Sequence, residues 1–364
     1  MNRRSFTLST AALSIAGALP LRVFASQRNF APTPSEWRTF EVVTRLEIEF
    51  ADVGSRAWIP APVVNTDWQQ SQATTWSGNM REAALVTDPA SGAQMVRALW
   101  ADDERSPQIE VVSRMRTRNR FNDWSRATRP QPPADLASHL KATELIRTDG
   151  IVAATAATIT ADKLTDVDKV RAIYDWVVSN TYRDPAVKGC GIGDIRAMLE
   201  TRNLGGKCAD LNALFVGLCR ASGIPARDIY GIRVAKSAFG YKELGAGSPD
   251  ISKAQHCRAE VWLAAYGWVA MDPADVAKVM RQETAEWIKD RRHDVVAPVD
   301  RALFGAWEGN WIGYNFAHDV ALPGSRGAKL PFLMYPQAET RGERVDSLDP
   351  DTFKYRITAR EVTA

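Results

Sequence analysis

The sequence predicts an α+β protein in which helices pack on an antiparallel sheet and a small antiparallel β domain precedes them. Apolar and polar residues alternate with a period of two over much of residues 36–125. Beyond residue 130 the i, i+3, i+4 spacing of helices dominates. A proline-rich stretch, Pro130-Gln131-Pro132-Pro133, separates the two patterns. With 364 residues, the chain is long enough for two or three folding units.

We therefore divide the chain into five segments. They are a signal peptide over 1–25, a linker over 26–35, the N-terminal β domain over 36–125, a core over 130–290, and a C-terminal β-rich extension packed on the core over 291–364.

The N-terminus has the pattern of an export signal. Arg3-Arg4-Ser5-Phe6 precedes a weakly apolar run from Ala11 to Leu21, and Val23-Phe24-Ala25 supplies small or modest residues at a cleavage site. The paired arginines and Phe6 resemble a twin-arginine signal. The alternative is a membrane anchor, but the apolar run is shorter than the ~20 residues that a span needs. We expect a soluble periplasmic protein of a bacterium, without stable membrane insertion after the signal is removed.

The charge excludes some partners. The formal net charge is +3, and Arg3, Arg4 and Arg22 contribute three positive charges to a segment without acids. Removal of that segment leaves 3 − 3 = 0. A neutral mature chain does not favour nucleic acid or an anionic membrane as a partner.

Strands and helices can be placed from these patterns. Alternation predicts strands in the ranges 40–50, 57–62, 83–87, 94–100, 108–116 and 353–357. Apolar spacing predicts helices in the ranges 136–146, 166–179 and 195–199, and a charged helix over 281–292.

Cys208 lies where a helix is expected to begin. Gly205-Gly206 forms a turn, and Leu211, Leu214, Phe215 and Leu218 follow helical spacing until Gly223. The first N–H groups of a helix are unpaired and carry partial positive charge, so they stabilise a thiolate. The same groups can hold the oxyanion of a tetrahedral intermediate. The residue is therefore a candidate nucleophile, although a small buried cysteine is the ordinary alternative.

A hairpin further along supplies a base and an acid. Residues 255–263 predict one strand, 264–267 a turn, and 268–272 the returning strand. Antiparallel pairing brings His256, at the start of the first strand, beside Asp272, at the end of the second. A histidine oriented by a carboxylate is what a nucleophilic cysteine requires. We predict Cys208, His256 and Asp272 as a catalytic triad.

These segments resemble the transglutaminase-like superfamily, and within it an exported bacterial branch of cysteine peptidases. The similarity lies in Gly205-Gly206-Lys207-Cys208-Ala209-Asp210, in Gly223-Ile224-Pro225-Ala226-Arg227, and in His256 followed by Gly267-Trp268-Val269-Ala270-Met271-Asp272-Pro273. It covers roughly residues 140–280. Residues 58–62 also resemble the N-terminal region of such proteins. The resemblance implies a papain/transglutaminase-like cysteine core over 130–290 and places the three predicted catalytic residues on the family's positions.

Several other residues are candidates for supporting roles. Many members of the family have a small residue and then Trp after the histidine, whereas this chain has Cys257 and Arg258. Cys257 can be a structural thiol, a redox modulator or a disulfide partner of Cys190. The resemblance makes Asn180 and Tyr182 candidates for a second oxyanion donor.

Four further kinds of side chain do not point to a separate site. Lys207 can help to hold a thiolate, with an exposed lysine as the alternative. Among the four cysteines, 190, 208, 219 and 257, there is no CxxC pair, so a zinc site of the usual spacing is not expected. His293 and His318 have no partners at ligand spacing. A group of aromatic residues can line a cleft or pack the β domain against the core: Trp307, Trp311, Tyr314 and Phe316.

The expected activity is thiol-dependent chemistry on an amide bond through an acyl-enzyme, without a metal or an organic cofactor. Attack by water makes the protein a peptidase or amidase, and attack by a lysine amine makes it a transglutaminase; we favour hydrolysis. The expected partner is a peptide or protein substrate, with cell-wall peptide as one candidate. The other readings are a non-catalytic periplasmic binding protein that retains the fold and a structural partner of the cell wall.

Overall fold

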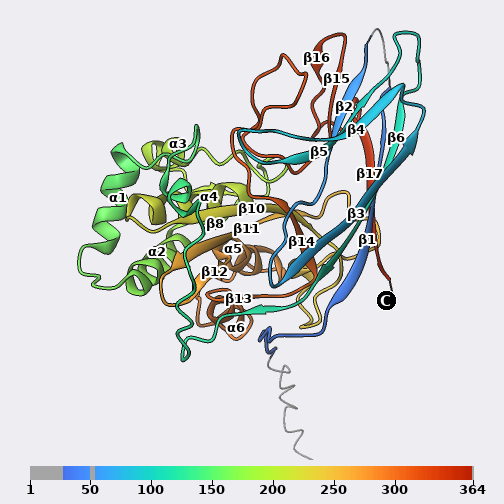
Figure 1. Cartoon of the computed structure of the whole chain (residues 1–364). Helices are drawn as coiled ribbons and strands as arrows, with labels where there is room; N and C mark the ends of the chain where they lie inside the picture. The colour runs from blue at the N-terminus through green and yellow to red at the C-terminus, as the bar shows by residue number, and fades with distance from the viewer. Residues whose placement is uncertain (1–27, 50–53, 363–364) are drawn as a thin grey trace, which may run out of the picture.

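The computed structural model describes residues 28–49 and 54–362. The predicted signal peptide and the first residues of the predicted linker lie outside this part of the chain. Figure 1 shows helices α1, α2 and α3 gathered at one side of the molecule and long strands at the other, with a sheet between them. This arrangement confirms the predicted α+β class and the β-rich N-terminal region before the core.

The β-rich part consists of two antiparallel sheets. One has the strand order β17-β1-β6-β3 and the other the order β16-β15-β2-β5-β4. Alternating burial explains why these residues form strands, since the apolar side of each sheet contributes to a shared cluster around Ile59, Val96 and Val111. The strands have the following bounds: β1 Arg38–Glu47, β2 Arg56–Pro60, β3 Gln69–Gly78, β4 Glu82–Thr87, β5 Gln94–Leu99, β6 Gln108–Thr117, β15 Gln337–Thr340, β16 Glu343–Arg344 and β17 Lys354–Val362.

The core is built on an antiparallel sheet of order β12-β11-β10-β14. Helix α4 lies against β11 and β10, and α1 and α2 pack on α4. Residues 208–220 of α4 are all buried, which explains why its sequence is apolar on nearly every side. The bounds are α1 Gly150–Thr160, α2 Asp166–Asn180, α3 Ile195–Thr201, α4 Cys208–Ala221, β10 Ala226–Arg233, β11 Gln255–Leu263, β12 Gly267–Met271, α5 Pro273–Gln282, α6 Ala297–Ala302 and β14 Trp311–Asn315.

Short elements connect these layers. Parallel pairing joins β8 to β9 directly before α4, and β7 pairs with β13. The bounds are β7 Arg120–Phe121, β8 Tyr182–Arg183, β9 Gly205–Gly206 and β13 Ala306–Trp307, with 3-10 helices η1 Leu136–Leu140 and η2 Lys242–Leu244.

The C-terminal residues complete both halves of the molecule. Strand β14 pairs with β10 in the core, whereas β15 pairs with β2 and β17 pairs with β1 in the β-rich part. The aromatic residues of this region pack in the interior: Trp307 and Trp311 lie against Trp68, with ring centroids 5.3 and 6.1 Å away. The segment 291–364 therefore contributes strands to four sheets, since β13, β14, β17 and the pair β15 and β16 lie in different ones.

Some expectations about individual elements were wrong. Only the short helix η1 forms within 136–146, and the helix in this region is α1, whose threonines and β-branched residues gave no clear helical signal. The charged helix expected over 281–292 is absent from the described structure. Helix α5 ends at Gln282, and the next helix, α6, begins at Ala297. Strand β3 was not expected, since its polar sequence QQSQATTWSG lacks apolar alternation.

The described part of the predicted linker is anchored to the core. Phe30 is 3% exposed and packs edge-on against Phe239 and Tyr241, with ring centroids 5.0 and 5.6 Å away. Arg28 forms an ion pair with Glu283 at 2.5 Å. These contacts tie residues 28–30 to the core.

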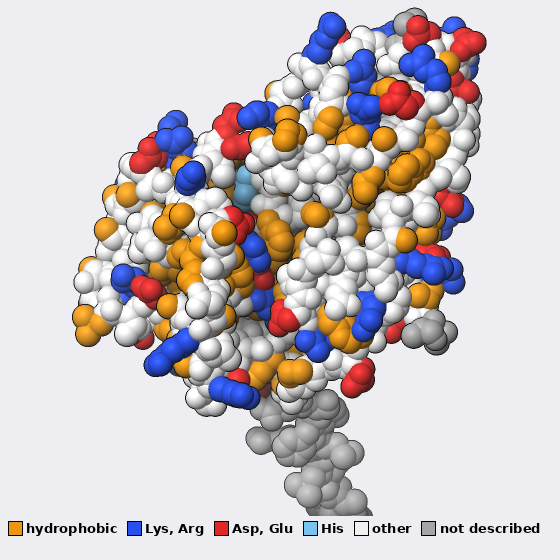
Figure 2. All heavy atoms as spheres, viewed as in Figure 1, with side chains coloured by type: hydrophobic (Ala, Val, Ile, Leu, Met, Phe, Trp, Pro, Cys, Tyr) orange, Lys and Arg blue, Asp and Glu red, His pale blue; other side chains and the backbone are white. Residues whose placement is uncertain are grey.

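The surface matches the balanced charge of the chain. Figure 2 shows basic and acidic side chains interspersed over the visible face, with small apolar patches between them. Among the described residues, no helix is both long and apolar enough to cross a membrane.

Candidate active site

Helix α4 begins at the predicted nucleophile. Cys208 is its first residue, and the preceding Lys207 has extended backbone angles. The Lys207 N–H donates to Asp210 Oδ2 at 2.9 Å, so this carboxylate closes the first turn. The Cys208 N–H has no hydrogen-bond acceptor among the described residues. It is therefore free to donate to the oxyanion that forms on a carbonyl oxygen when the sulfur attacks the carbonyl carbon.

Asp210 also holds the loop that faces Cys208. Its Oδ1 accepts hydrogen bonds from the N–H groups of Ile192 and Gly193 at 3.0 and 2.9 Å. Gly191 has φ +86°, and a Cβ there would lie 1.8 Å from Asp210 Oδ2. Only glycine fits this position without displacing the carboxylate. One buried side chain thus connects the first turn of α4 to residues 192 and 193.

The hairpin of β11 and β12 brings the predicted base and acid together. Ala259 pairs with Met271, so the start of β11 lies beside the end of β12. His256 Nε2 donates to Asp272 Oδ2 at 2.8 Å, and both side chains are buried. Trp311 Nε1 donates to the His256 carbonyl at 2.9 Å and fixes the backbone of the histidine. The structure therefore brings His256 and Asp272 into the arrangement that the sequence predicted.

A second carboxylate, which the sequence analysis missed, lies beside the same imidazole. Asp275 Oδ2 is 3.3 Å from His256 Nε2, and Asp275 Oδ1 is 2.6 Å from Arg233 Nη2. Asp275 follows Asp272 by three residues in the first turn of α5, and that spacing was the available signal. Burial opposes its ionisation, but Arg233 and His256 hold the pKa of Asp275 well below its usual value.

Asp272 is held by several donors. Its Oδ1 accepts hydrogen bonds from Asn212 Nδ2 at 3.3 Å and from the Asp275 N–H at 3.1 Å. It thereby caps α5 while its Oδ2 faces His256. Burial and the neighbouring Asp275 nevertheless raise the pKa of Asp272.

Arg258, one of the departures from the family pattern, belongs to this network. Its Nε is 3.6 Å from Asp272 Oδ2, and its guanidinium lies over the Trp307 and Trp311 rings. The side chain is 2% exposed, and burial lowers its pKa to about 10. It therefore supports the carboxylate from within the core.

The environment of His256 favours its charged form. Burial and the positive charge of Arg233 oppose protonation, but the carboxylates of Asp275 and Asp272 outweigh them and raise the pKa of His256 to about 9. A histidine normally titrates near 6.5. The imidazolium is therefore the stable form at neutral pH, which suits an ion pair with a thiolate.

Three cysteines converge at the candidate nucleophile. Burial would raise the pKa of Cys208, but hydrogen bonds involving Cys190, Cys257 and His256 hold it well below its usual value. The Cys190 carbonyl accepts from the Ala209 N–H at 2.9 Å, and Cys208, Cys190 and Cys257 lie in one buried cluster. The fourth cysteine, Cys219, lies on the same helix, and burial raises its pKa well above the usual value. All four are free thiols.

Cys208 opens onto a small hollow of about 250 Å³. Its walls come from β8, β10, the start of β11, α5 and the 245–254 loop, and its lining includes Cys208 and His256. Cys208 is 3% exposed, so a substrate has to enter this hollow to reach the sulfur.

Neither predicted oxyanion residue lines the hollow. The Asn180 side chain donates back to the Trp176 carbonyl at 2.8 Å, at the end of its own helix. Tyr182 lies over Gly205, and its hydroxyl donates to Asn203 Oδ1 at 3.4 Å. Among residues 180–183, Arg183 lines the hollow.

One group of side chains has the donor atoms of a cation site. Ligand atoms of His256, Asp272 and Asp275 lie within 4.8 Å of one another. However, Arg233 and Arg258 lie within 4 Å of the two carboxylates and supply compensating positive charge. These partners favour a hydrogen-bonded histidine over a bound metal at this position.

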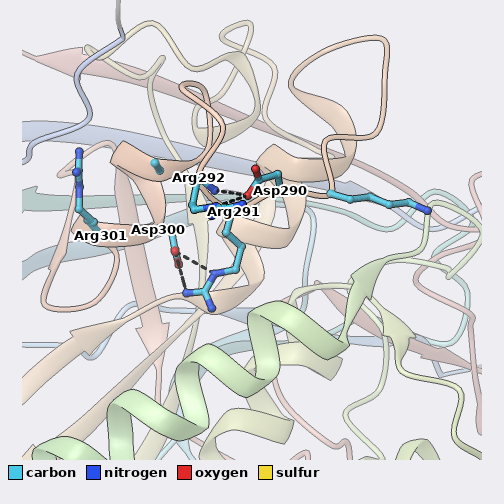
Figure 3. A pocket seen from close by; sticks show the side chains of 7 residues that line it. Asp290, Arg291, Arg292, Asp300 and Arg301 are labelled. Carbon is cyan, nitrogen blue, oxygen red and sulfur yellow. Dashed lines mark hydrogen bonds and ion pairs between the residues drawn. The ribbon is translucent and has the colours of Figure 1, made fainter.

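A larger hollow lies elsewhere, along the segment 289–301. Its volume is about 720 Å³, and Figure 3 shows Arg291 extended toward Asp300 and Arg292 toward Asp290. Arg291 Nη2 is 2.8 Å from Asp300 Oδ2 and 2.7 Å from Asp175 Oδ1. The charges of Arg291, Asp300 and Asp175 are therefore neutralised by one another within the protein. The lining of this hollow includes no cysteine, serine or histidine.

Comparison with known proteins identifies the family. Residues 153–273 match the model of the transglutaminase-like superfamily, and this range contains Cys208, His256 and Asp272. An uncharacterized protein of Haemophilus influenzae is 37% identical over 322 residues, which cover 84% of this chain and 86% of that protein. The chain belongs to the transglutaminase-like superfamily.

A solved structure has the same fold. A provisionally assigned cysteine protease from Cytophaga hutchinsonii aligns with a TM-score of 0.54 at 13% identity, over 91% of this chain and 93% of that one. The periplasmic domain of TgpA from Pseudomonas aeruginosa aligns over 68% of this chain and 90% of its own length at 14% identity. The TM-score of that second alignment is 0.34, too low to support an inference.

Proposed function

We propose that this protein is an exported, thiol-dependent amide-bond hydrolase that uses Cys208 as nucleophile, His256 as general acid and base, and Asp272 as the residue that orients His256. The observation that carries the proposal is the 2.8 Å hydrogen bond from His256 Nε2 to Asp272 Oδ2, next to a buried thiol of low pKa. The fold and the family range support the same reading.

The acylation step follows from these positions. The Cys208 thiolate attacks the carbonyl carbon of a peptide or carboxamide, and the Cys208 N–H stabilises the resulting oxyanion. The His256 imidazolium donates its proton to the leaving nitrogen, the C–N bond breaks, and an amine departs. The product on the protein is a thioester at Cys208.

Deacylation uses the same residues. Neutral His256 accepts a proton from water, the hydroxide adds to the thioester, and the C–S bond breaks to release an acid and the thiolate. Asp272 keeps the Nε2 proton on the carboxylate side of the ring, which leaves Nδ1 for the proton transfers. Asp275 adds negative charge beside Nε2 and stabilises the imidazolium.

The activity is tested with peptide and cell-wall fragment libraries, with and without an added primary amine, read by mass spectrometry. Hydrolysis adds the mass of water across a cleaved bond, whereas a product that carries the added amine would identify a transglutaminase. Cys208→Ala should reduce turnover on the order of 10³-fold or more. Cys219→Ala, on the same helix, should leave it nearly unchanged.

A non-catalytic binding protein predicts a different outcome. Fragments would be retained without a mass change, and retention would survive Cys208→Ala. Retention on whole peptidoglycan under the same conditions would instead indicate a structural partner of the cell wall. Either result would overturn the hydrolase assignment.

We also propose that Arg3 and Arg4 direct export to the periplasm. The basis is the sequence pattern of residues 1–25. Cell fractionation should recover the wild-type chain from the periplasm. An Arg3→Lys, Arg4→Lys variant should remain in the cytoplasm; equal export of the two would contradict the assignment.

A further inference from the structure

Positive charge collects around the hollow at Cys208. Apart from His256, its lining carries four basic side chains and one acidic side chain. The basic ones are Arg183, Arg233, Lys253 and Lys278, and the acid is Asp250. The basic residues come from four separate parts of the chain, namely β8, β10, the segment before β11, and α5. Their convergence at the candidate nucleophile is a property of the folded site.

Two of these cations are neutralised within the protein. Arg233 is 2.6 Å from Asp275 and donates to the Leu244 carbonyl at 2.8 Å. Lys278 is 3.3 Å from the Glu243 carboxylate and donates to its carbonyl at 2.8 Å. Their role is structural, and they leave little charge for a ligand.

The charges of the other two basic side chains, Arg183 and Lys253, are not neutralised by an ion pair among the described residues. Arg183 Nε donates to the neutral side chain of Gln282 at 2.6 Å, and no carboxylate lies within ion-pair distance in the described structure. Lys253 is exposed and has no ion pair within residues 28–49 and 54–362. The acid of the lining, Asp250, is paired with Arg356 at 3.0 Å. Arg183 and Lys253 therefore bring positive charge to the hollow that no ion pair among the described residues neutralises.

We propose that the substrate carries a carboxylate close to the scissile amide and that Arg183 and Lys253 bind it. This inference rests on the proposed function and adds the chemical class of the substrate. An Arg and a Lys that both line a small hollow attract a carboxylate and disfavour a basic peptide. The carboxylate has two possible sources, an acidic side chain or a free C-terminus.

Two alkylating reagents of similar size provide a first test. Iodoacetate carries a carboxylate, whereas iodoacetamide is neutral, and both modify Cys208 without knowledge of the substrate. The measured quantity is the ratio of their rates at Cys208, divided by the same ratio for free cysteine. We expect the normalised ratio to exceed one, and Arg183→Gln and Lys253→Gln each to lower it roughly threefold to tenfold.

A matched control removes the same charge elsewhere. Lys169→Gln lies in the first turn of α2, outside the lining of the hollow, and should leave the ratio unchanged. His256 contributes to the ratio in every variant, so the differences between variants report on Arg183 and Lys253. A ratio unchanged by both substitutions would overturn the inference. Iodoacetamide labelling no faster than for free cysteine would instead contradict the proposed function.

Peptides then distinguish the two sources of the carboxylate. Cleaved library members are compared as pairs that differ by Glu against Gln, or by C-terminal acid against amide. A preference for one acid member of at least roughly threefold, lost in Arg183→Gln, supports that source. Equal cleavage of acid and neutral members in both pairs would overturn the inference while leaving the hydrolase assignment intact.

The cluster of thiols carries a second, independent inference. Cys190 and Cys257 lie in the same buried cluster as Cys208, but their backbones differ. Cys257 is held inside β11, where it pairs with Tyr230. Cys190 lies in an irregular loop between Gly189 and Gly191, both with positive φ. A loop cysteine can move to bond geometry more readily than a cysteine in the middle of a sheet.

We propose that a peroxide oxidant switches the protein off through a disulfide between Cys208 and Cys190. The Cys208 thiolate attacks the O–O bond of hydrogen peroxide, which yields a sulfenic acid and hydroxide. The Cys190 sulfur then attacks the sulfenic sulfur, an S–S bond forms, and water leaves with the thiol proton. Two electrons pass from the two thiols to the peroxide, and an added dithiol reverses the reaction.

Peptide mapping tests this switch. After treatment with hydrogen peroxide, the wild type should contain the Cys190–Cys208 disulfide and lose iodoacetamide labelling at Cys208, and dithiothreitol should restore the labelling. Cys190→Ser should instead accumulate a dimedone adduct at Cys208 and show no disulfide. A disulfide to Cys257, or dithiol-reversible protection in Cys190→Ser, would overturn the assignment.

Discussion

Among the described residues, His256 and His318 each lie near a buried carboxylate, yet their environments favour opposite protonation states. At His256, Nε2 is 2.8 Å from Asp272, and the pKa is raised to about 9. At His318, Nε2 is 3.6 Å from Asp228, and the pKa is lowered to about 3. The contrast shows that burial beside an acid is not enough to make a charged, catalytically useful histidine.

The neighbouring charges account for the difference. His256 faces two carboxylates, and their combined attraction exceeds the effects of burial and of Arg233. At His318, partial removal from water lowers the pKa, and Arg220 and His139 add further positive charge that opposes protonation. Burial also raises the pKa of Asp228 to about 7, and neither of its oxygens has a hydrogen-bond partner in the described structure. The environment of His256 and Asp272 therefore favours the charged histidine, whereas that of His318 and Asp228 favours the neutral histidine.

The largest expected effect separates the two histidines by activity. His256→Gln should lower the rate of amide hydrolysis by about 10²- to 10⁴-fold, because the general acid and base is lost. His318→Gln should change it less than about threefold, since that ring does not line the hollow at Cys208. Both rates are measured on the same cleaved peptide, with thermal unfolding as a control for folding. Similar losses in the two variants would remove the basis of the comparison.

Substitution of the two neighbouring carboxylates, Asp272 and Asp228, should affect activity in the same order as substitution of the histidines. Asp272→Asn keeps the shape of the side chain but no longer stabilises the imidazolium, and we expect kcat to fall on the order of 10²-fold or more. Asp228→Asn should leave kcat within about twofold. Steady-state kinetics with matched protein concentrations distinguish the cases, and a large loss of kcat in Asp228→Asn would assign that pair a role in the chemistry.

The smallest effect concerns stability. The folded pKa of Asp228, about 7, is above that of an unfolded Asp, so folding binds a proton and stability falls as pH rises between about 4 and 7. Asp228→Asn should remove this dependence and gain at most a few kcal/mol at pH 8, as one pKa unit corresponds to about 1.4 kcal/mol. Urea unfolding at pH 4.5 and pH 8 measures the difference. Parallel pH dependence in the two proteins would contradict the assigned pKa.

The sequence predicted most strands and the helices α2, α3 and α4, whereas apolar spacing over 136–146 wrongly predicted a helix. The hairpin of β11 and β12 and the start of α4 lie at their predicted positions, because each is bounded by glycine or proline and filled with apolar residues. Strand β3 and helix α1 were missed, since tertiary packing outweighs their local preferences. Pairing of β17 with β1 joins opposite ends of the chain, and local patterns do not contain that information.

For the site, residue type and order sufficed for His256 and Asp272 but not for their surroundings. Asp275 and Arg233 meet across 42 residues, and the Cys190 loop reaches α4 across 18. The resemblance made Asn180 a candidate as a polar side chain upstream of the cysteine, yet this side chain donates to the end of its own helix. Contacts made by folding, rather than motifs, set the charge of the site.

The most direct test of the account is the pH dependence of iodoacetamide labelling at Cys208. If His256 holds the thiolate, the rate should change little between pH 6 and pH 8, whereas free cysteine slows about tenfold for each unit below a pKa near 8.5. His256→Gln should restore the steep dependence. A wild-type profile as steep as that of free cysteine, unaltered in His256→Gln, would contradict an activated nucleophile.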